Sequence, residues 1–200
     1  MCIRDSPETI DKISNELTPM VATARLIKQE HPDASVVFIG PCASKKLEAS
    51  RRTVRSDVDF VITFEELTGM FEAKGILLDE IKAMDEMKDA TAAGRGYGVA
   101  GGVANAIKEC IEKYYPGTPV NIQHAESLAE CKKALLLAKA GKMNGCLIEG
   151  MACPGGCIAG AGTNIAIPVA ARAVDKFKNE AEKKVPDESV DQEMVELEKE

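Results

Sequence analysis

The 200-residue sequence has no tryptophan, only 4% aromatic residues and no long apolar run. Without aromatic side chains the core must be built from Val, Ile, Leu, Ala and Met, a composition typical of layered α/β proteins. No segment approaches the roughly 18 apolar residues of a membrane-spanning helix, and the first residues lack the apolar stretch of a secretion signal. These absences predict one globular domain of two lobes, located in the cytoplasm and without a membrane partner.

Basic charge is also scarce. The formal net charge is −7, and the segment 186–200 holds seven acidic residues and one lysine, so it carries −6 of that total. The rest of the chain is nearly neutral and has no basic stripe of the kind that binds nucleic acid. We therefore expect no nucleic-acid partner, and an acidic tail at 186–200 that is mobile or loosely helical.

Cysteine is plentiful, with seven residues in a chain that has no export signal. In a reducing cytoplasm, such cysteines favour metal binding over disulfides. The most informative segment is 149–162, which reads Glu-Gly-Met-Ala-Cys-Pro-Gly-Gly-Cys-Ile-Ala-Gly-Ala-Gly and follows the apolar run 146–148. Its Gly155 and Gly156 can adopt positive φ and let the backbone approach a bulky inorganic group. Cys153 and Cys157 are therefore candidate thiolate ligands for iron or zinc.

Short apolar runs that end in turns predict buried strands at 36–39 and 60–62, and further strands are predicted at 120–124 and 146–149. Helices are expected at 10–31 with a break at Thr18-Pro19, at 63–73, from the glycine-rich turn 94–102 to 115, at 127–140 and at 166–184. Two of them begin with capping boxes, Thr63 with Glu66 and Ser127 with Glu130. In the helix that ends at 115, one face is predicted to carry Ala104, Ile107, Ile111 and Tyr114. The alternation predicts an α/β fold with parallel sheet flanked by helices, and a polar surface connection at 79–95.

The carboxyl ends of parallel strands usually form the reactive edge of a sheet. Cys42 follows the strand at 36–39, and Cys153 and Cys157 follow the strand at 146–149, so these three can converge. The cysteines Cys110, Cys131 and Cys146 fall within predicted helices or a strand and are interpreted as small buried hydrophobes.

Three converging thiolates favour an iron–sulfur cluster, which normally has four cysteine ligands. Zinc with His31 or His124 as the fourth ligand is a weaker alternative, because Cys42 has no nearby cysteine partner.

The segment Gly96-Tyr-Gly-Val-Ala-Gly101 matches the pattern G-x-G-x-x-G, although no strand precedes it. Glu126 could serve as the acidic residue that such a dinucleotide site needs, so a nucleotide-binding module remains an alternative. We favour a tight turn that brings the free N–H groups of a helix N-terminus toward an anionic cofactor.

Over roughly residues 7–180, the chain resembles the catalytic domain of the iron-only (FeFe) hydrogenases. The resemblance is carried by Gly40-Pro-Cys-Ala-Ser-Lys-Lys-Leu-Glu48, by Gly96-Tyr-Gly-Val-Ala-Gly-Gly-Val103 and by Met151-Ala-Cys-Pro-Gly-Gly-Cys157. Thr18 and Pro19 also match a family position beside the cofactor. The resemblance implies a domain at 7–185 with lobes at about 7–90 and 91–185 and a cofactor site between them.

The resemblance further implies an oxidoreductase that reversibly reduces protons to H₂ at an H-cluster in anaerobic metabolism. This cofactor is a 4Fe–4S cube joined through a cysteine sulfur to a two-iron unit with CO and cyanide ligands. Cys42, Cys153 and Cys157 would bind the cube, Cys157 would bridge to the two-iron unit, and Lys45 would pair with a cyanide. The implied pocket residues are Pro41, Thr18, Pro19, Tyr97 and Met151, with Ser14 and Glu48 near polar or proton-relay positions. The implied partners are ferredoxin or accessory iron–sulfur domains, and H-cluster maturation proteins.

The chain also departs from the family pattern. The family supplies a further ligand cysteine and a proton-relay cysteine from a Thr-Ser-Cys-Cys-Pro-type motif, which this sequence lacks before Pro7. We expect residues 1–6 to be a non-native remnant, Cys2 not to be a ligand, and this chain to turn over weakly or not at all. Gly40 and Met20 replace residues common in the family, which indicates a divergent subgroup. A non-catalytic iron–sulfur sensor or assembly relative of the same fold is the main alternative.

Overall fold

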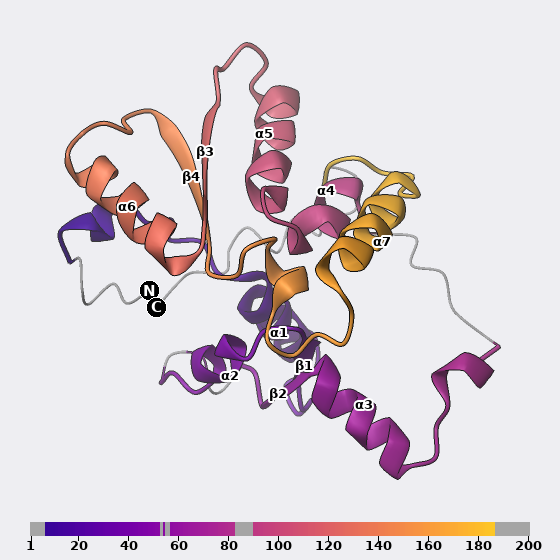
Figure 1. Ribbon diagram of the computed structural model, residues 1–200. Coiled ribbons are helices and arrows are strands. Elements are labelled where there is room, and N and C mark those ends of the chain that lie inside the picture. The colour runs from indigo at the N-terminus through magenta and orange to yellow at the C-terminus, as the bar shows by residue number, and fades with distance from the viewer. Residues whose placement is uncertain (1–6, 53, 55–56, 83–89, 187–200) are drawn as a thin grey trace. The chain divides into compact units, whose positions relative to one another are not determined.

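The computed structural model describes residues 7–52, 54, 57–82 and 90–186, and the chain divides into two compact units (Figure 1). The β1–β2 unit comprises the described residues of 15–82 and 160–164, and the β3–β4 unit comprises those of 7–14, 90–159 and 165–186. Each unit holds one pair of parallel strands with helices beside it, which confirms the predicted α/β class. The predicted remnant at 1–6, most of the acidic tail and the middle of the connection at 83–89 lie outside the described residues.

In the β1–β2 unit, β1 (Val37–Gly40) pairs in parallel with β2 (Phe60–Thr63). The buried core of this unit is formed by α1 (Pro19–Glu30), through Met20, Val21 and Ala24, together with Val58. The helix begins at Pro19 because proline fits the first turn of a helix but cannot continue one from its N-terminal side. The prediction of a helix over 10–31 is therefore wrong between 13 and 18, and a separate 3-10 helix covers Pro7–Lys12.

The helix α3 (Phe64–Ala73) follows β2 directly and begins with the predicted capping box. Glu66 donates its backbone N–H to Thr63 Oγ1 at 3.2 Å, and Thr63 donates its backbone N–H to Glu66 Oε2 at 2.8 Å. The short helix α2 (Ser44–Ala49), between β1 and β2, was not predicted, because six residues are too few for a clear helical period.

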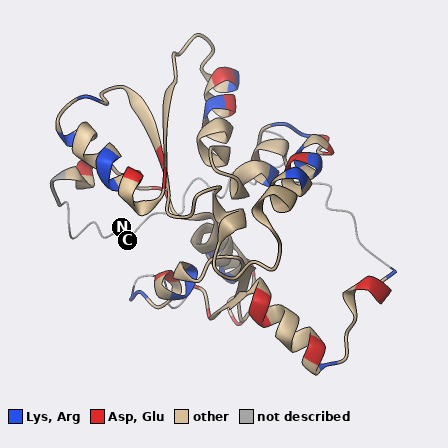
Figure 2. Cartoon of the chain, in the orientation of Figure 1, with Lys and Arg blue, Asp and Glu red and all other residues tan. Residues whose placement is uncertain are grey.

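In the β3–β4 unit, β3 (Asn121–Glu126) pairs in parallel with β4 (Cys146–Met151). The helix α6 (Leu128–Lys139) contacts both strands and α5 (Gly102–Tyr114) contacts β4, so the strand pair lies between the two helices (Figure 1). Ala125 on β3 and Cys131 and Ala134 on α6 form the buried cluster beside the strands. The strand pair is mostly free of charge, whereas charged residues lie mainly on the helices (Figure 2).

The inward face of α5 is narrower than the sequence predicts. Ala104 and Ala106 are buried, but Ile107 and Tyr114 are 36% and 47% exposed. The residues Ala104, Ile107, Ile111 and Tyr114 keep the predicted helical spacing, but only the start of α5, which contacts α4 (Ala92–Arg95), is buried. The final helix, α7 (Ile167–Asn179), ends before the predicted residue 184. None of the described helices is both long and apolar enough to cross a membrane.

Candidate metal centre

The cysteine loop, residues 152–157, follows the end of β4 and has the predicted backbone conformation. Gly155 and Gly156 adopt φ values of 93° and 90°. Gly156 donates its N–H to the carbonyl of Cys153 at 2.9 Å, and Cys157 then begins a short 3-10 turn. This turn puts the two cysteines on one compact loop at the carboxyl end of a parallel strand, where reactive groups gather.

The glycines of the cysteine loop let its backbone pack closely against another backbone segment of the same unit. A Cβ at Gly156 would collide with the backbone of Val99 and Ala100, and Ala100 donates its N–H to the carbonyl of Gly155 at 3.1 Å. The expectation that Gly156 leaves room for an inorganic group is therefore wrong, because backbone fills that room. The loop is packed against the turn 96–101.

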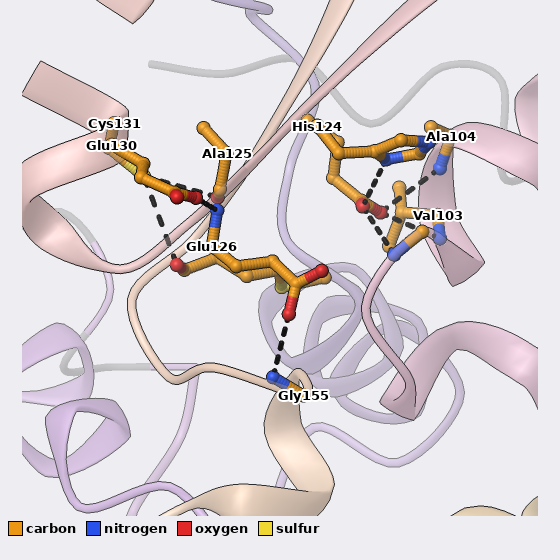
Figure 3. Close-up of polar contacts among 11 residues, drawn as sticks. Val103, Ala104, His124, Ala125, Glu126, Glu130, Cys131 and Gly155 are labelled. Atoms are coloured by element: carbon orange, nitrogen blue, oxygen red, sulfur yellow. Dashed lines mark hydrogen bonds and ion pairs between the residues drawn. The ribbon is translucent and has the colours of Figure 1, made fainter. Parts of the chain in front are cut away.

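Two acidic residues, Glu126 at the end of β3 and Glu130 on α6, link the cysteine loop to the rest of the unit (Figure 3). Gly155 donates its N–H to the carboxylate of Glu126 at 2.9 Å, and Glu126 donates its own N–H to the carboxylate of Glu130 at 2.7 Å. Only half of the predicted Ser127 capping box forms, since Ser127 accepts the N–H of Glu130 but donates its own N–H to the carbonyl of Met151. The end of β3 is thereby bonded both to the end of β4 and to the loop.

Glu149 is a buried acidic residue on β4 that caps the N-terminus of α5. Its side chain is 7% exposed, and its carboxylate accepts the N–H groups of Gly101 at 2.6 Å, Val103 at 3.0 Å and Ala104 at 3.2 Å. His124 Nδ1 lies 3.3 Å from the same carboxylate. A carboxylate is stabilised there by the partial positive charge of the helix N-terminus.

This cap overturns the prediction that the N-terminus of α5 approaches an anionic cofactor. The amides that would bind such a cofactor already donate to Glu149. The nucleotide-binding alternative loses its phosphate site for the same reason, and 96–98 is a 3-10 turn that follows α4 and not a strand. Sequence reasoning missed Glu149, although one acidic residue inside the apolar run 146–149 was a signal, because a buried charge needs partners.

The β1–β2 unit carries the other predicted site residues. Cys42 lies between β1 and α2, its Sγ is 3.0 Å from Ser44 Oγ, and its carbonyl accepts the N–H of Lys45 at 3.2 Å. Lys45 Nζ donates to Glu48 Oε2 at 2.6 Å. Thr18, the residue before α1, donates its Oγ1 hydroxyl to Glu48 Oε1 at 2.5 Å. The side chains of Lys45 and Glu48 are 22% and 19% exposed, so this network of three side chains is partly shielded from water.

Gly162, five residues after Cys157 in the chain, belongs to the β1–β2 unit. Its N–H donates to the carbonyl of Pro41 at 2.9 Å, and its carbonyl accepts the N–H of Glu65 at 3.1 Å. A Cβ at Gly162 would collide with the side chain of Thr63, so this contact also depends on glycine. Within the β1–β2 unit, the segment 160–164 is therefore bonded to the residue before Cys42.

The remaining predicted pocket residues belong to the β3–β4 unit. Tyr97 lies in the turn 96–98, and burial raises the pKa of its phenol above the usual value, so the phenol stays protonated near neutral pH. Met151 is the last residue of β4. Ser14 lines a cavity of about 410 Å³ at the start of β4, with Lys12 and Cys146, at the opposite end of that strand from the cysteine loop.

Six cysteines lie among the described residues, and none of these six is in a disulfide. Cys131 is buried and Cys110 half-buried, and burial raises the pKa of both thiols, in agreement with their interpretation as small hydrophobes. Cys146 begins β4 and is only half-buried, with Asn121 Nδ2 3.3 Å from its Sγ.

The candidate ligands Cys42, Cys153 and Cys157 are each at least partly exposed. Within the described part of the chain, no three His, Cys, Asp or Glu side chains form a metal-binding group. Cys42 lies in one unit, and Cys153 and Cys157 lie in the other. As a donor set, thiols on loops at strand ends fit an iron–sulfur cluster.

Comparisons with known proteins agree on the family. Residues 1–161 match the family described as iron only hydrogenase large subunit, C-terminal domain. Iron hydrogenase 1 of Clostridium pasteurianum is 25% identical over 197 residues, covering 78% of this chain and 34% of that protein. The cytosolic Fe-S cluster assembly factor NAR1 of Kluyveromyces lactis is 39% identical over 67 residues, covering 34% of this chain and 14% of that protein.

The fold is shared with solved hydrogenases. A structure of the FeFe-hydrogenase HydA1 from Chlamydomonas reinhardtii has a TM-score of 0.69 and 20% identity, covering 89% of this chain and 63% of that one. In length, the chain spans about a third of Iron hydrogenase 1 and matches a smaller share of NAR1. With a family match over most of its length and the same fold, the chain belongs to the family of iron-only hydrogenase large subunits, C-terminal domain.

Proposed function

We propose that this chain is part of an FeFe hydrogenase and that Cys42, Cys153 and Cys157 bind the 4Fe–4S cube of an H-cluster. The observation that carries the proposal is that all three cysteines lie on loops directly after parallel strands, Cys42 after β1 and Cys153 and Cys157 after β4. The match to the hydrogenase family over residues 1–161 includes all three cysteines and supports the same ligand set.

When bound, an H-cluster supplies the reversible exchange of two protons and two electrons with H₂, with the electrons delivered by ferredoxin or accessory iron–sulfur domains. The residues of the chain hold and orient this group. In this proposal Cys42, Cys153 and Cys157 would hold the group through their thiolates, and Lys45 would supply a cation for an anionic ligand of the iron. Glu48 and Thr18 fix the Lys45 ammonium in place, since both bond within the same network. In this proposal Tyr97 and Met151 would exclude water from the bound group.

A second candidate is a non-catalytic iron–sulfur protein, related to the assembly factors. The observation that favours it is the 39% identity to NAR1, which is higher than the 25% identity to Iron hydrogenase 1, although over a shorter segment. In this candidate the same cysteines hold a plain cluster without the two-iron unit. A cytoplasmic location is part of both candidates, since NAR1 is described as cytosolic.

Infrared and EPR spectroscopy of the chain produced with H-cluster maturation proteins separate these candidates. The hydrogenase proposal predicts CO and cyanide bands together with a cube signal, and loss of the bands in Cys157→Ala. The matched control is Cys110→Ala, which removes a half-buried helical cysteine and should keep the bands. A cube signal without CO and cyanide bands in the unmodified chain would instead support the non-catalytic candidate. Bands at full strength in Cys157→Ala would contradict its role as bridge.

A further inference from the structure

We propose that Glu126 and Glu149 are positioning residues that clamp Gly155, and with it the cysteine loop, from two sides. Gly155 lies midway between Cys153 and Cys157, so fixing its backbone fixes the directions in which both cysteines leave the loop. The consequence for cluster binding rests on the proposed function, whereas the clamp itself does not.

Glu126 forms the first side of the clamp. It is the last residue of β3, and its carboxylate accepts the N–H of Gly155 at 2.9 Å. Its own N–H is bonded to Glu130 on α6 at 2.7 Å, so the backbone that carries the carboxylate is anchored to a helix (Figure 3). The loop amide is therefore bonded to a strand end that the parallel pairing with β4 already fixes.

Glu149 forms the second side, through the turn 96–101. Its carboxylate holds the amides of Gly101, Val103 and Ala104, and the residue just before them, Ala100, donates its N–H to the carbonyl of Gly155. The carbonyl of Gly155 is thus linked back to β4, the strand from which the loop departs. Both backbone polar groups of Gly155 are bonded, and each bond leads to a carboxylate on one strand of the same pair.

This arrangement answers a specific problem of the loop. A glycine-rich segment loses much conformational entropy when it becomes ordered, so a metal site on it would bind weakly unless the protein ordered the loop beforehand. The two carboxylates order it without any metal. We infer that they raise the affinity of Cys153 and Cys157 for iron by preorganisation and not by ligation.

Substitution by glutamine should have different effects at the two positions, because the two carboxylates accept different numbers of hydrogen bonds. Glu126 uses one oxygen for one N–H, so the amide oxygen of Glu126→Gln can still accept it. Glu149 uses Oε2 for Gly101 and Oε1 for Val103 and Ala104. Glu149→Gln has one acceptor oxygen and turns an NH₂ group toward backbone donors, so it cannot restore the cap. The clamp therefore predicts rescue by glutamine at position 126 and no rescue at position 149.

The test is amide hydrogen exchange in the metal-free full chain, followed by NMR. In Glu126→Ala the Gly155 amide should exchange about tenfold faster or more, because it loses a hydrogen bond to a charged acceptor. In Glu126→Gln it should stay close to the wild-type rate, and the amide of Ile148 in β4 should be unchanged in both. Glu112→Ala, which removes an exposed acid from α5, is the matched control and should change neither amide. Wild-type protection of Gly155 in Glu126→Ala would overturn the clamp.

A second measurement is iron bound after anaerobic iron–sulfur reconstitution. Glu126→Ala and Glu149→Gln should retain less iron than wild type, whereas Glu126→Gln and Glu112→Ala should match it. If the wild-type chain binds no iron, the proposed function fails and the exchange rates still decide the Glu126 side of the clamp. If Glu126→Ala exposes the Gly155 amide but binds iron as well as wild type, preorganisation by Glu126 is overturned while the cluster assignment stands.

Discussion

The two segments that carry the candidate ligands are held in different ways. In the cysteine loop, the backbone itself is bonded, with Gly155 held between Glu126 and Ala100 and with Gly156 packed against the turn 96–101. In the segment 41–48, the side chains are bonded, with Lys45 and Thr18 both donating to Glu48. The difference teaches that the loop tolerates almost no change in backbone shape. The segment with Cys42 can change side chains at small energetic cost, so its residues are available for chemistry.

The largest expected effect comes from adding a methyl group to the cysteine loop, which tests whether its backbone tolerates any change. Gly156→Ala should lower the free energy of unfolding by about 4 kcal/mol, because the residue combines φ of 90° with a collision against Ala100. Gly117→Ala is the matched control, since Gly117 has φ of 87° but no atom within 4 Å of the added Cβ. It should lose about 1 kcal/mol. Urea denaturation of both variants measures the difference, and equal losses would show that the contact with Ala100 carries no weight.

Removal of the buried cap is the next largest change. Glu149→Ala leaves three amides at the start of α5 without their acceptor and should lower the free energy of unfolding by about 3 kcal/mol. Thermal or urea unfolding measures this loss, with Glu112→Ala on the exposed face of the same helix as a control expected to lose less than about 0.5 kcal/mol. A loss below 1 kcal/mol for Glu149→Ala would mean that water replaces the carboxylate and that the cap does not hold the turn.

In the segment with Cys42, a double-mutant cycle should give a smaller effect. Thr18→Val and Glu48→Ala, alone and combined, should show a coupling of about 1 kcal/mol, as expected for a partly exposed hydrogen bond to a charged acceptor. Each single variant should leave unfolding cooperative and the secondary structure unchanged by circular dichroism. A coupling near zero would show that the bond between Thr18 and Glu48 does not stabilise the protein. A coupling as large as the Glu149 effect would show that the two segments are held equally strongly.

The smallest predicted effect concerns the buried thiol of Cys131. Burial raises its pKa above the ordinary value of 9.0, so above pH 9 the folded protein retains a proton that the unfolded chain has lost. This contribution to stability is complete below pH 9 and is lost as the pH rises through the raised pKa. Urea unfolding between pH 8 and pH 10.5 should therefore show a stability decline that is shallower in Cys131→Ala. An identical slope in wild type and variant would contradict a buried neutral thiol at this position.

Much of the fold could be predicted from local pattern. All four strands of the described residues were predicted. The burial predicted for the first two strands was wrong, because Val37, Ile39 and Phe60 are exposed. The box formed by Thr63 and Glu66 gave the start of α3, since both bonds lie within four residues of sequence. The predicted break at Thr18-Pro19 is confirmed, but the non-helical segment extends back to residue 13. The helix α2 was missed, because short helices depend on tertiary contacts more than on period.

The site was predictable only in part. Residue types and strand ends were enough to single out Cys42, Cys153 and Cys157, since those signals are local. The sequence does not show which groups bond the loop, because Glu126 and Glu149 are 29 and 48 residues from the amides they accept. The glycines illustrate the same limit. Positive φ at Gly155 and Gly156 followed from the sequence, whereas the neighbour that they approach, Ala100, lies more than fifty residues away.

Iron and sulfide content after anaerobic reconstitution of single cysteine variants tests the central claim most directly. The account predicts that Cys42→Ala, Cys153→Ala and Cys157→Ala each bind markedly less iron than wild type. Cys110→Ala and Cys131→Ala, which remove a half-buried and a buried thiol with raised pKa values, should bind as much as wild type. Wild-type iron content in the first three variants, or its loss in the last two, would contradict the assignment of the ligands.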